Sequence, residues 1–520
     1  MKKLNILQSL LLSFLSVGLW ACFDDQSSLG TAGAATEIVI ADLPDTAVIS
    51  YNGVVLDVTP DMQGTTYPED ELEYAWYMYD SRDADFGADG FEEGYRAHRV
   101  GDGKTLSYEV NLPSGDYYFI FEAVAKTTGY SQAKRMKVSV STDFSRGFFI
   151  LKETAESMTE LDMYTGQKGV TSDLMQKRLG ASLEGMPLNL AVVYSQAYIN
   201  DDNQTMERTN MVHIFTESTY RGFRTEDMAP TFDRATLRFD GLDGDETALN
   251  MGNGMFVAFF LSNKGVYSIG NNAANSGKFG FPVGTGASRF MLPYGMNMVY
   301  WDDTEHHIYI VDYNGRAASP ASYPLNGVNE ENLTCIAAGQ HNTTVSMIGK
   351  HWFLCEDKTD HSRWLYQVGG MAMQAPSISV SRLDPSLHVS KAASVVGNAL
   401  QATILYALHE GKLYTYNWVS GAESGPISLP GITNDETLTY VSNQYLNTGS
   451  DKFDYLVVAT QKGNEYKIYF YDELVGGVPI SPTEKMATGM GKVKCVRYVT
   501  SQLNLMTLGI QPIPRLPWCD

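Results

Sequence analysis

Few residues in this 520-residue chain form a recognisable chemical motif. Glu305-His306-His307 places two imidazoles side by side, but neighbouring side chains on a strand point to opposite faces and cannot easily share one metal ion. We therefore expect a hairpin turn there. No G-x-S-x-G or H-E-x-x-H motif is present, and we expect neither a metal site nor a cofactor. The acidic loops at 80–94 and 240–246 could bind calcium, although solvated loops explain them more simply.

Aromatic side chains offer a different chemistry, the stacking of a ligand ring. An exposed indole near the end of a hairpin would present a large, rigid surface to a sugar or a peptide. Packing of each indole in the core is the alternative interpretation. The candidates for stacking are Trp301, Trp352, Trp364 and Trp418. A catalytic pair of carboxylates cannot be selected from so many acidic residues, so we predict no enzyme but keep a carboxylate-dependent one open.

These candidates lie on a pattern of apolar strand, turn and aromatic strand that repeats along the chain. It recurs near residues 255, 297, 346, 402 and 454. A period of about 40–50 residues with several strands per unit is typical of β-propeller blades. Residues 146–520 have room for about seven blades, and two stacked sandwiches are the alternative. Residues 171–185 interrupt the pattern with the one helix-like stretch of this region.

Residues 37–143 contain shorter strand-like runs, each 5–9 residues long and bounded by Gly, Pro, Asp or Asn. Their spacing predicts an antiparallel β-sandwich of the Ig type. Trp76 falls in the third run, where such sandwiches bury a tryptophan. Gly115-Asp116-Tyr117 predicts a tyrosine corner, in which the hydroxyl is bonded to the backbone. The fold class is therefore all-β, a sandwich followed by a propeller-like domain.

The first 21 residues read as a signal peptide, with Lys2 and Lys3 before a short apolar run. Leu19-Trp20-Ala21-Cys22 resembles a bacterial lipobox, whose cysteine is lipidated and becomes the new N-terminus. Asp24-Asp25 resembles an export signal that carries lipoproteins to the cell surface. Residues 22–36 are otherwise small and polar and predict a lipid anchor followed by a flexible linker.

The net charge limits the possible partners, and the cysteines limit the possible disulfide bonds. The net charge of −22 argues against nucleic acid as a partner, because nucleic-acid binders carry basic patches. Cys335, Cys355, Cys495 and Cys519 remain after the lipobox. Four cysteines allow three connectivities, of which Cys335–Cys355 with Cys495–Cys519 is the local one. Their spacings match no known framework, which favours buried free thiols.

Tyr74-x-Trp76, Gly115-x-Tyr117 and Thr128-Gly129, following a lipobox, together resemble the PKD-like family of Bacteroidetes lipoproteins. The resemblance implies a lipid-anchored outer-membrane protein that faces the cell exterior. Asp45-Thr46-Ala47 likewise resembles the O-glycosylation acceptor of these bacteria, with Thr46 as the modified residue.

The family resemblance also implies a role. Its members are expected beside SusC/SusD-type nutrient uptake systems, as non-catalytic accessory components that bind a glycan or a peptide. The implied partners are the outer membrane through lipidated Cys22, a SusC/SusD-like transporter complex and the ligand. The alternatives are a carboxylate-dependent enzyme that degrades glycans or peptides on the propeller face, and a purely structural or adhesive surface protein.

Overall fold

The computed structural model describes most of the chain from residue 37 to residue 500. The described ranges are 37–50, 53–80, 97–166, 168–200, 204–254, 257–269, 276–294, 297–342, 348–371, 374–397, 403–448, 451–472 and 482–500. Within these ranges, no helix has the length and apolar character needed to cross a membrane.

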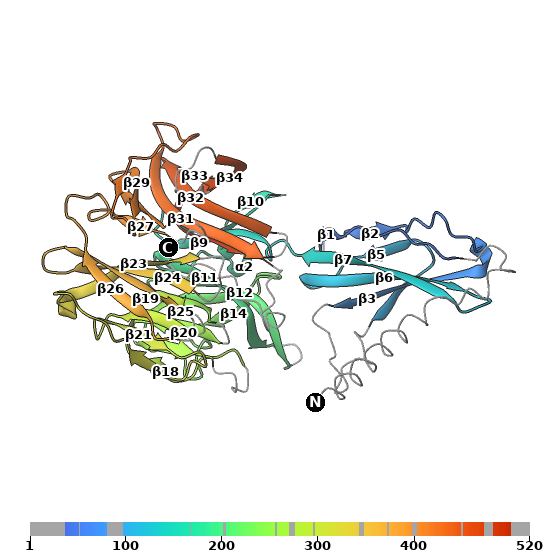
Figure 1. Ribbon diagram of the computed structural model, residues 1–520, viewed down its shortest axis with the longest axis horizontal. Helices are drawn as coiled ribbons and strands as arrows, with labels where there is room; N and C mark the ends of the chain where they lie inside the picture. The colour runs from blue at the N-terminus through green and yellow to red at the C-terminus, as the bar shows by residue number, and fades with distance from the viewer. Residues whose placement is uncertain are drawn as a thin grey trace, which may run out of the picture.

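The N-terminal part is a two-sheet β-sandwich, seen at the right of Figure 1. One sheet has the strand order β1-β7-β6-β3-β4, and β2 pairs with β5 in the other. A 3-10 turn, η2 (Glu69–Glu71), precedes β3. The strands are β1 (Thr46–Ile49), β2 (Val55–Val58), β3 (Leu72–Asp80), β4 (His98–Asp102), β5 (Leu106–Glu109), β6 (Gly115–Ala125) and β7 (Ser131–Ser141).

The sandwich core forms because β6 alternates fully buried and half-buried residues along its whole length. Trp76 is completely buried against the ring of Phe121, with the ring centroids 5.0 Å apart. The Tyr117 hydroxyl donates a hydrogen bond of 2.9 Å to the carbonyl oxygen of Pro113. Both the core tryptophan and the tyrosine corner are therefore confirmed.

The remaining described residues form seven four-stranded antiparallel sheets, the blades of a propeller. Blade 1 has the order β10-β9-β8-β35, and the other blades follow the chain in steps of four strands. Figure 1 shows them arranged around one centre at the left of the molecule. The predicted all-β class, with a sandwich and about seven blades, is confirmed.

The bounds of the propeller elements, blade by blade, are as follows. Blade 1 has β8 (Gly147–Glu153), β9 (Thr159–Thr165), β10 (Gly169–Thr171) and β35 (Lys492–Val499); blade 2 has β11 (Pro187–Ile199), β12 (Met206–Thr216), β13 (Tyr220–Arg224) and β14 (Pro230–Asp233). Blade 3 has β15 (Ala248–Asn253), β16 (Ala258–Ser262), β17 (Gly265–Ser268) and β18 (Pro282–Gly284); blade 4 has β19 (Ala287–Tyr294), β20 (Asn297–Asp302), β21 (His307–Val311) and β22 (Ala318–Pro320). Blade 5 has β23 (Leu333–Asn342), β24 (Ile348–Asp357), β25 (Arg363–Met371) and β26 (Ser377–Arg382); blade 6 has β27 (Ser394–Val396), β28 (Ile404–His409), β29 (Lys412–Asn417) and β30 (Glu423–Ser424). Blade 7 has β31 (Thr437–Thr448), β32 (Asp451–Lys462), β33 (Glu465–Asp472) and β34 (Pro482–Met490). Helix α2 (Leu174–Leu179) and the 3-10 turn η3 (Glu330–Asn332) lie between strands.

The ring is closed by β35, which comes from the C-terminal end of the described chain. It pairs antiparallel with β8, so that Val499 lies opposite Gly147. It also lies against the first strands of its neighbours, β11 and β31. Blades bury their faces only against each other, so this strand completes blade 1 and packs it against blades 2 and 7.

A register shift, which bends the strand, occurs in the first strand of blades 2, 3, 4, 5 and 7 and in β35 of blade 1. At two of these shifts an asparagine joins adjacent blades. The Asn189 amide donates to Leu249 O at 3.2 Å, and the Asn250 amide donates to Arg289 O at 2.8 Å. The shifts fall between Pro187/Asn189, Ala248/Asn250, Ala287/Met291, Cys335/Ala337, Leu438/Tyr440 and Val493/Cys495.

The sandwich meets the propeller at blade 2. Ser114 donates both its N–H, at 3.0 Å, and its hydroxyl to the Glu226 carboxylate. The Thr142 hydroxyl donates to Thr225 O at 3.4 Å. These polar contacts join the end of β7 and the β5–β6 connection to the turn between β13 and β14.

Candidate functional site

The tryptophans predicted to stack on a ligand lie mostly in the core. Trp301 and Trp352 are completely buried, on the second strands of blades 4 and 5, and Trp418 is 5% exposed. The Trp352 indole N–H donates to Gly397 O at 3.0 Å. A ligand ring cannot reach these three side chains, so the stacking prediction is wrong for them.

Trp364 differs, because it is only partly buried. Its indole N–H donates to the Ser362 hydroxyl at 3.2 Å, and the Arg382 guanidinium lies 5.9 Å from its ring centre. One face of this indole is therefore already covered by a cation from β26. The four tryptophans are not brought together on one surface.

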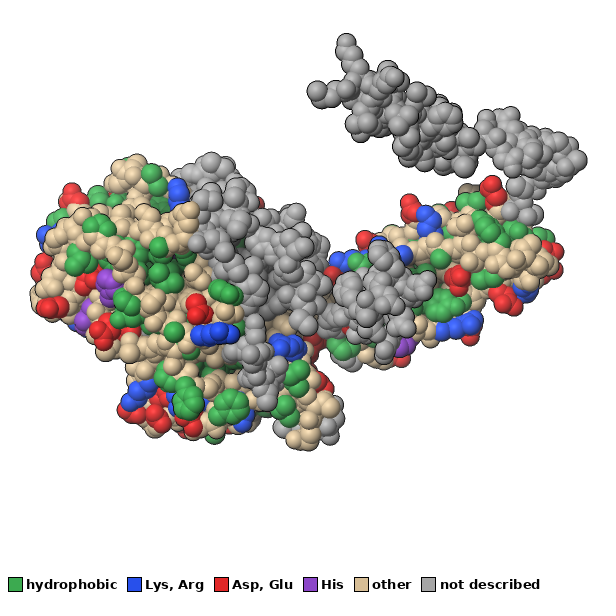
Figure 2. Space-filling view, turned by 60° about the horizontal axis from the view of Figure 1, so that its bottom comes forward, with side chains coloured by type: hydrophobic (Ala, Val, Ile, Leu, Met, Phe, Trp, Pro, Cys, Tyr) green, Lys and Arg blue, Asp and Glu red, His purple; other side chains and the backbone are tan. Residues whose placement is uncertain are grey.

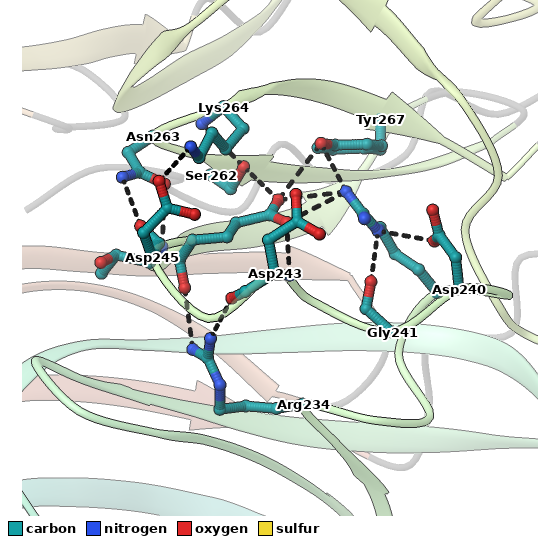
Figure 3. A network of polar contacts seen from close by, with 12 residues as sticks. Arg234, Asp240, Gly241, Asp243, Asp245, Ser262, Asn263, Lys264 and Tyr267 are labelled. Carbon is teal, nitrogen blue, oxygen red and sulfur yellow. Dashed lines mark hydrogen bonds and ion pairs between the residues drawn. The ribbon is translucent and has the colours of Figure 1, made fainter.

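A buried carboxylate organises the loop before blade 3, and Figure 3 shows the surrounding network. Glu246 accepts hydrogen bonds from the Ser262 hydroxyl at 2.6 Å and the Tyr267 hydroxyl at 3.2 Å. The Arg238 guanidinium lies 3.0 Å from the same carboxylate and donates to Tyr267 at 2.7 Å. Burial and the nearby Glu246 charge raise the pKa of Tyr267. Each charge in this cluster thus has a partner.

The same arrangement recurs in two other blades. In each, the glutamate precedes the first strand of the blade and accepts from a tyrosine hydroxyl of the third strand. Tyr366 donates to Glu330 at 2.8 Å in blade 5, and Tyr469 donates to Glu436 at 2.9 Å in blade 7. A cluster repeated at equivalent places in the fold is a structural device of the blade.

The blade 5 copy contains more titratable groups than the other two. His307 Nδ1 lies 2.7 Å from Glu330 Oε2, and its Nε2 lies 2.8 Å from Ala321 O. The Tyr323 hydroxyl donates to the other Glu330 oxygen at 2.8 Å. Both imidazole nitrogens therefore face acceptors. Burial opposes the charged form, but the bonds to Glu330 and Ala321 outweigh it and raise the pKa of His307.

This cluster resembles part of a hydrolytic triad but is not arranged as one. A general base needs a free ring nitrogen within reach of a nucleophile. Here both nitrogens of His307 already face acceptors, and the adjacent hydroxyls of Tyr323 and Tyr366 are bonded to Glu330. The arrangement favours the charged form of the imidazole between blades 4 and 5. The adjacent His306 lies in the turn that joins β20 to β21, which confirms the predicted hairpin, and its Nδ1 lies 2.8 Å from Leu333 O.

The acidic loop at 240–246 is paired with cations. Asp240 lies 3.1 Å from the Arg238 guanidinium, and Asp245 forms an ion pair with Lys264. Over the described ranges, no three His, Cys, Asp or Glu side chains are grouped as a metal site would require. The other acidic loop lies outside the described residues beyond Asp80.

An exposed apolar pair lies at the outer edge of blades 2 and 3. Phe239 is 63% exposed and Phe281 is 90% exposed. Their segments run side by side, because the Phe239 N–H donates to Phe279 O at 3.1 Å and the Phe279 N–H donates to Leu237 O at 2.9 Å. Leu237 and Phe279 are completely buried, so in each segment the exposed phenylalanine comes two residues after a buried apolar side chain.

Figure 2 shows apolar side chains interspersed with acidic and basic ones on the face of the propeller that it draws. The sequence "KFGFPVG" at 278–284 gave no sign of which phenylalanine is exposed, and the pair was not predicted.

Several predicted residues are placed elsewhere or are not described. Cys22, Asp24 and Asp25 lie outside the described residues. Thr46 begins β1, is partly buried and pairs with Val138. Three cysteines are buried and free, namely Cys335, Cys355 and Cys495, and Cys519 is not described.

Comparison with known proteins addresses the N-terminal part directly. The model of the PKD-like family matches residues 22–187. This confirms the family resemblance for the sandwich and the first strands of the propeller. None of the curated protein sequences compared with the chain matches it.

Solved structures match over more of the chain, at low identity. A quinonprotein alcohol dehydrogenase-like protein from Bacteroides thetaiotaomicron is 12% identical, with 90% of this chain and 100% of that chain covered and a TM-score of 0.38. Dihydro-heme d1 dehydrogenase NirN is 10% identical over 73% of each chain, with a TM-score of 0.34. The WD40 domain of SCAP from fission yeast is 10% identical over 67% of this chain and 75% of that chain, with a TM-score of 0.22.

Proposed function

We propose that the protein is a surface-exposed outer-membrane lipoprotein that binds a glycan or a peptide as a non-catalytic accessory component of a SusC/SusD-type uptake system. The lipobox-like sequence at 19–22 and the PKD-like match over residues 22–187 support the anchor and the family context. The observation that carries the binding role is the exposed Phe239–Phe281 pair.

The exposure of the pair is what gives it binding capacity. Covering a phenylalanine side chain with a ligand gains about 1.5–3 kcal/mol relative to leaving it in water. Aromatic rings favour flat apolar partners, such as the face of a sugar ring or an aromatic or proline side chain of a peptide. Asp240, whose side chain is 69% exposed, follows Phe239 in the chain and offers an acceptor to hydroxyl or amide donors.

The contacts of three buried carboxylates support a non-catalytic role. Glu246, Glu330 and Glu436 each accept several hydrogen bonds from neighbouring side chains. A carboxylate held in this way is poorly placed to exchange a proton with a substrate.

The sandwich suits a presenting role. It lies between the lipobox-like cysteine and the propeller along the chain, and its contact with Glu226 ties it to blade 2. Tethering through Cys22 would then hold the propeller away from the membrane, with the blade edges open to ligands.

Purification from the native host tests the proposed partners. Tagged protein is extracted from outer membranes with mild detergent, and co-purifying proteins are identified by mass spectrometry. We expect a TonB-dependent transporter and its lid lipoprotein. Recovery of the protein alone from such membranes would contradict the uptake assignment.

A binding assay tests the ligand class. The protein without its signal peptide is applied to arrays of glycans and peptides, beside a Phe239→Ala/Phe281→Ala variant. We expect retained ligands that the double variant loses at least tenfold. Val419→Ala is the matched control, since Val419 is 64% exposed on blade 6 and away from the pair. Binding that survives the double variant would place the site elsewhere, and no binding at all would contradict the function.

A further inference from the structure

Two of the buried cysteines face each other across blade 5. Cys335 on β23 and Cys355 on β24 are Cα partners in the antiparallel register. Residues directly opposite in such a pair project their side chains to the same face of the sheet. Both are buried, at 7% and 0% exposed, and both thiols are free in this structure.

The backbone already holds the two residues at the separation that a disulfide needs. Opposed residues in an antiparallel pair have Cα atoms about 4.5–5.5 Å apart. Disulfides span Cα separations of about 4.4–6.8 Å. The Cys335 N–H points at Asp303 Oδ1 in blade 4, at 3.5 Å, as in the narrow, non-hydrogen-bonded kind of pair. The Cys335 thiol donates to Ala337 O at 3.4 Å, within its own strand.

Cys495 provides a contrast within the same chain. It lies on β35, and its sulfur is 3.9 Å from Asn189 Oδ1 and 4.0 Å from Leu190 O. No other cysteine of the described ranges is a register partner of Cys495. The strand register thus pairs Cys335 with Cys355 and places Leu151 opposite Cys495.

We propose that Cys335 and Cys355 form a cross-strand disulfide that closes the β23–β24 hairpin. The oxidant is a disulfide of a thiol oxidoreductase or of glutathione. One cysteine thiolate attacks that disulfide, forms a mixed disulfide and releases one thiolate. The second cysteine thiolate then attacks the mixed disulfide and releases the other thiolate. Two protein thiols lose two protons and two electrons, and one disulfide of the oxidant becomes two thiols.

The position of the pair sets when the bond forms. Cys335, Cys355 and Tyr366 belong to the apolar core between blades 4 and 5. Burial and the neighbouring Cys335 raise the pKa of the Cys355 thiol well above its usual range, so the reactive thiolate is scarce once the blades have packed. Oxidation therefore accompanies folding and is slow in the folded, reduced protein.

Refolding of the full chain in glutathione buffer tests the pairing without reference to its cellular location. The protein is unfolded and reduced, refolded with oxidised and reduced glutathione, quenched with acid, unfolded and alkylated, and digested for mass spectrometry. We expect one peptide pair linked through Cys335 and Cys355, and alkylated Cys495. Refolded protein in which Cys335 and Cys355 are both alkylated would overturn the proposal.

Two variants and one native sample complete the test. Cys335→Ser is expected to leave Cys355 fully alkylated, whereas Cys495→Ser is expected to leave the linked peptide unchanged. Loss of the link in Cys495→Ser would overturn the assignment by showing that Cys495 takes part. The proposal relies on the proposed function only for an oxidising compartment. A link that forms on refolding but is absent from protein purified from the cell envelope would therefore overturn the proposed location and support the cysteine geometry.

Discussion

Phe279 and Phe281 lie two residues apart, yet they belong to opposite environments of the propeller. Phe279 is completely buried between blades 2 and 3, whereas Phe281 is 90% exposed at their outer edge. Polar groups in the two environments differ in the same way. Within the ring, Glu246 is saturated by donors, whereas at the edge Asp240 has one cation partner and an otherwise open side chain.

The difference shows which region is free to bind. An unpaired polar group in the interior would cost about 1–3 kcal/mol or more, so interior groups are held by their own neighbours. An exposed apolar ring has no such partner and gains free energy only when something covers it. Interior groups therefore stabilise the fold, and the outer edge of blades 2 and 3 is the surface that we propose for ligand binding.

The largest effect is expected from removal of an interior charge. Glu246→Ala leaves the Arg238 guanidinium, which is 7% exposed, without its main counter-charge. We expect a loss of about 3–5 kcal/mol in the free energy of unfolding, because a buried ion is left uncompensated. Urea unfolding followed by fluorescence measures this. Asp240→Ala is the control and should cost less than about 1 kcal/mol, because its partner keeps other contacts. Equal effects of the two variants would remove the distinction between interior and edge.

A smaller effect is expected from His213, a neutral histidine in the interior of blade 2. Its ring lies 2.7 Å from the Tyr220 hydroxyl and 2.7 Å from Gln196 Oε1, and burial lowers its pKa to about 3. The unfolded chain binds this proton near its ordinary pKa of about 6.5, so stability falls as the pH drops below that value. We expect about 2 kcal/mol less stability at pH 5 than at pH 7 from this group.

Comparison of unfolding midpoints at pH 7 and pH 5 checks the role of His213. His213→Asn removes the titrating group while keeping a donor and an acceptor, so its stability should fall less between the two pH values than that of the unchanged protein. An identical fall in both proteins would mean that His213 does not remain neutral in the fold.

His307 should show the opposite sign, and a smaller effect because its side chain is 24% exposed. Its pKa is raised in the folded state, so its contribution is complete below the unfolded pKa of about 6.5 and is lost as the pH rises through the higher folded value. His307→Gln should therefore cost more stability at pH 5.5 than at pH 8.5, measured by urea unfolding. A cost that is equal at both pH values would show that the imidazole is not charged beside Glu330.

The architecture was predictable from the sequence because its repeats are local. Each blade brings its own strands in order, so segments near 255, 297, 346, 402 and 454 recur at similar intervals. The helix-like exception at 171–185 corresponds to α2. The closing strand was not predictable, since β35 pairs with β8 more than 300 residues earlier and no local pattern records that pairing.

The candidate sites were harder to predict for a related reason. A blade is covered on both faces by its neighbours, so its strands are apolar on both sides and the usual alternation of apolar and polar residues is lost. Trp301 and Trp352 therefore looked no different from exposed aromatic residues, and Phe281 looked no different from buried ones. Exposure in this fold depends on position across the blade, which is a property of the assembled ring.

The smallest effect on stability is expected at the outer edge, where it separates binding from folding most sharply. Phe281→Ala should change the free energy of unfolding by less than about 0.5 kcal/mol, because the side chain is 90% exposed and loses little contact. Phe279→Ala, the same substitution two residues away, should cost about 3–5 kcal/mol by leaving a cavity. Urea unfolding of both variants, together with ligand binding by Phe281→Ala, completes the comparison. A destabilised Phe281→Ala variant would mean that this ring already packs on the protein and is not available to a ligand.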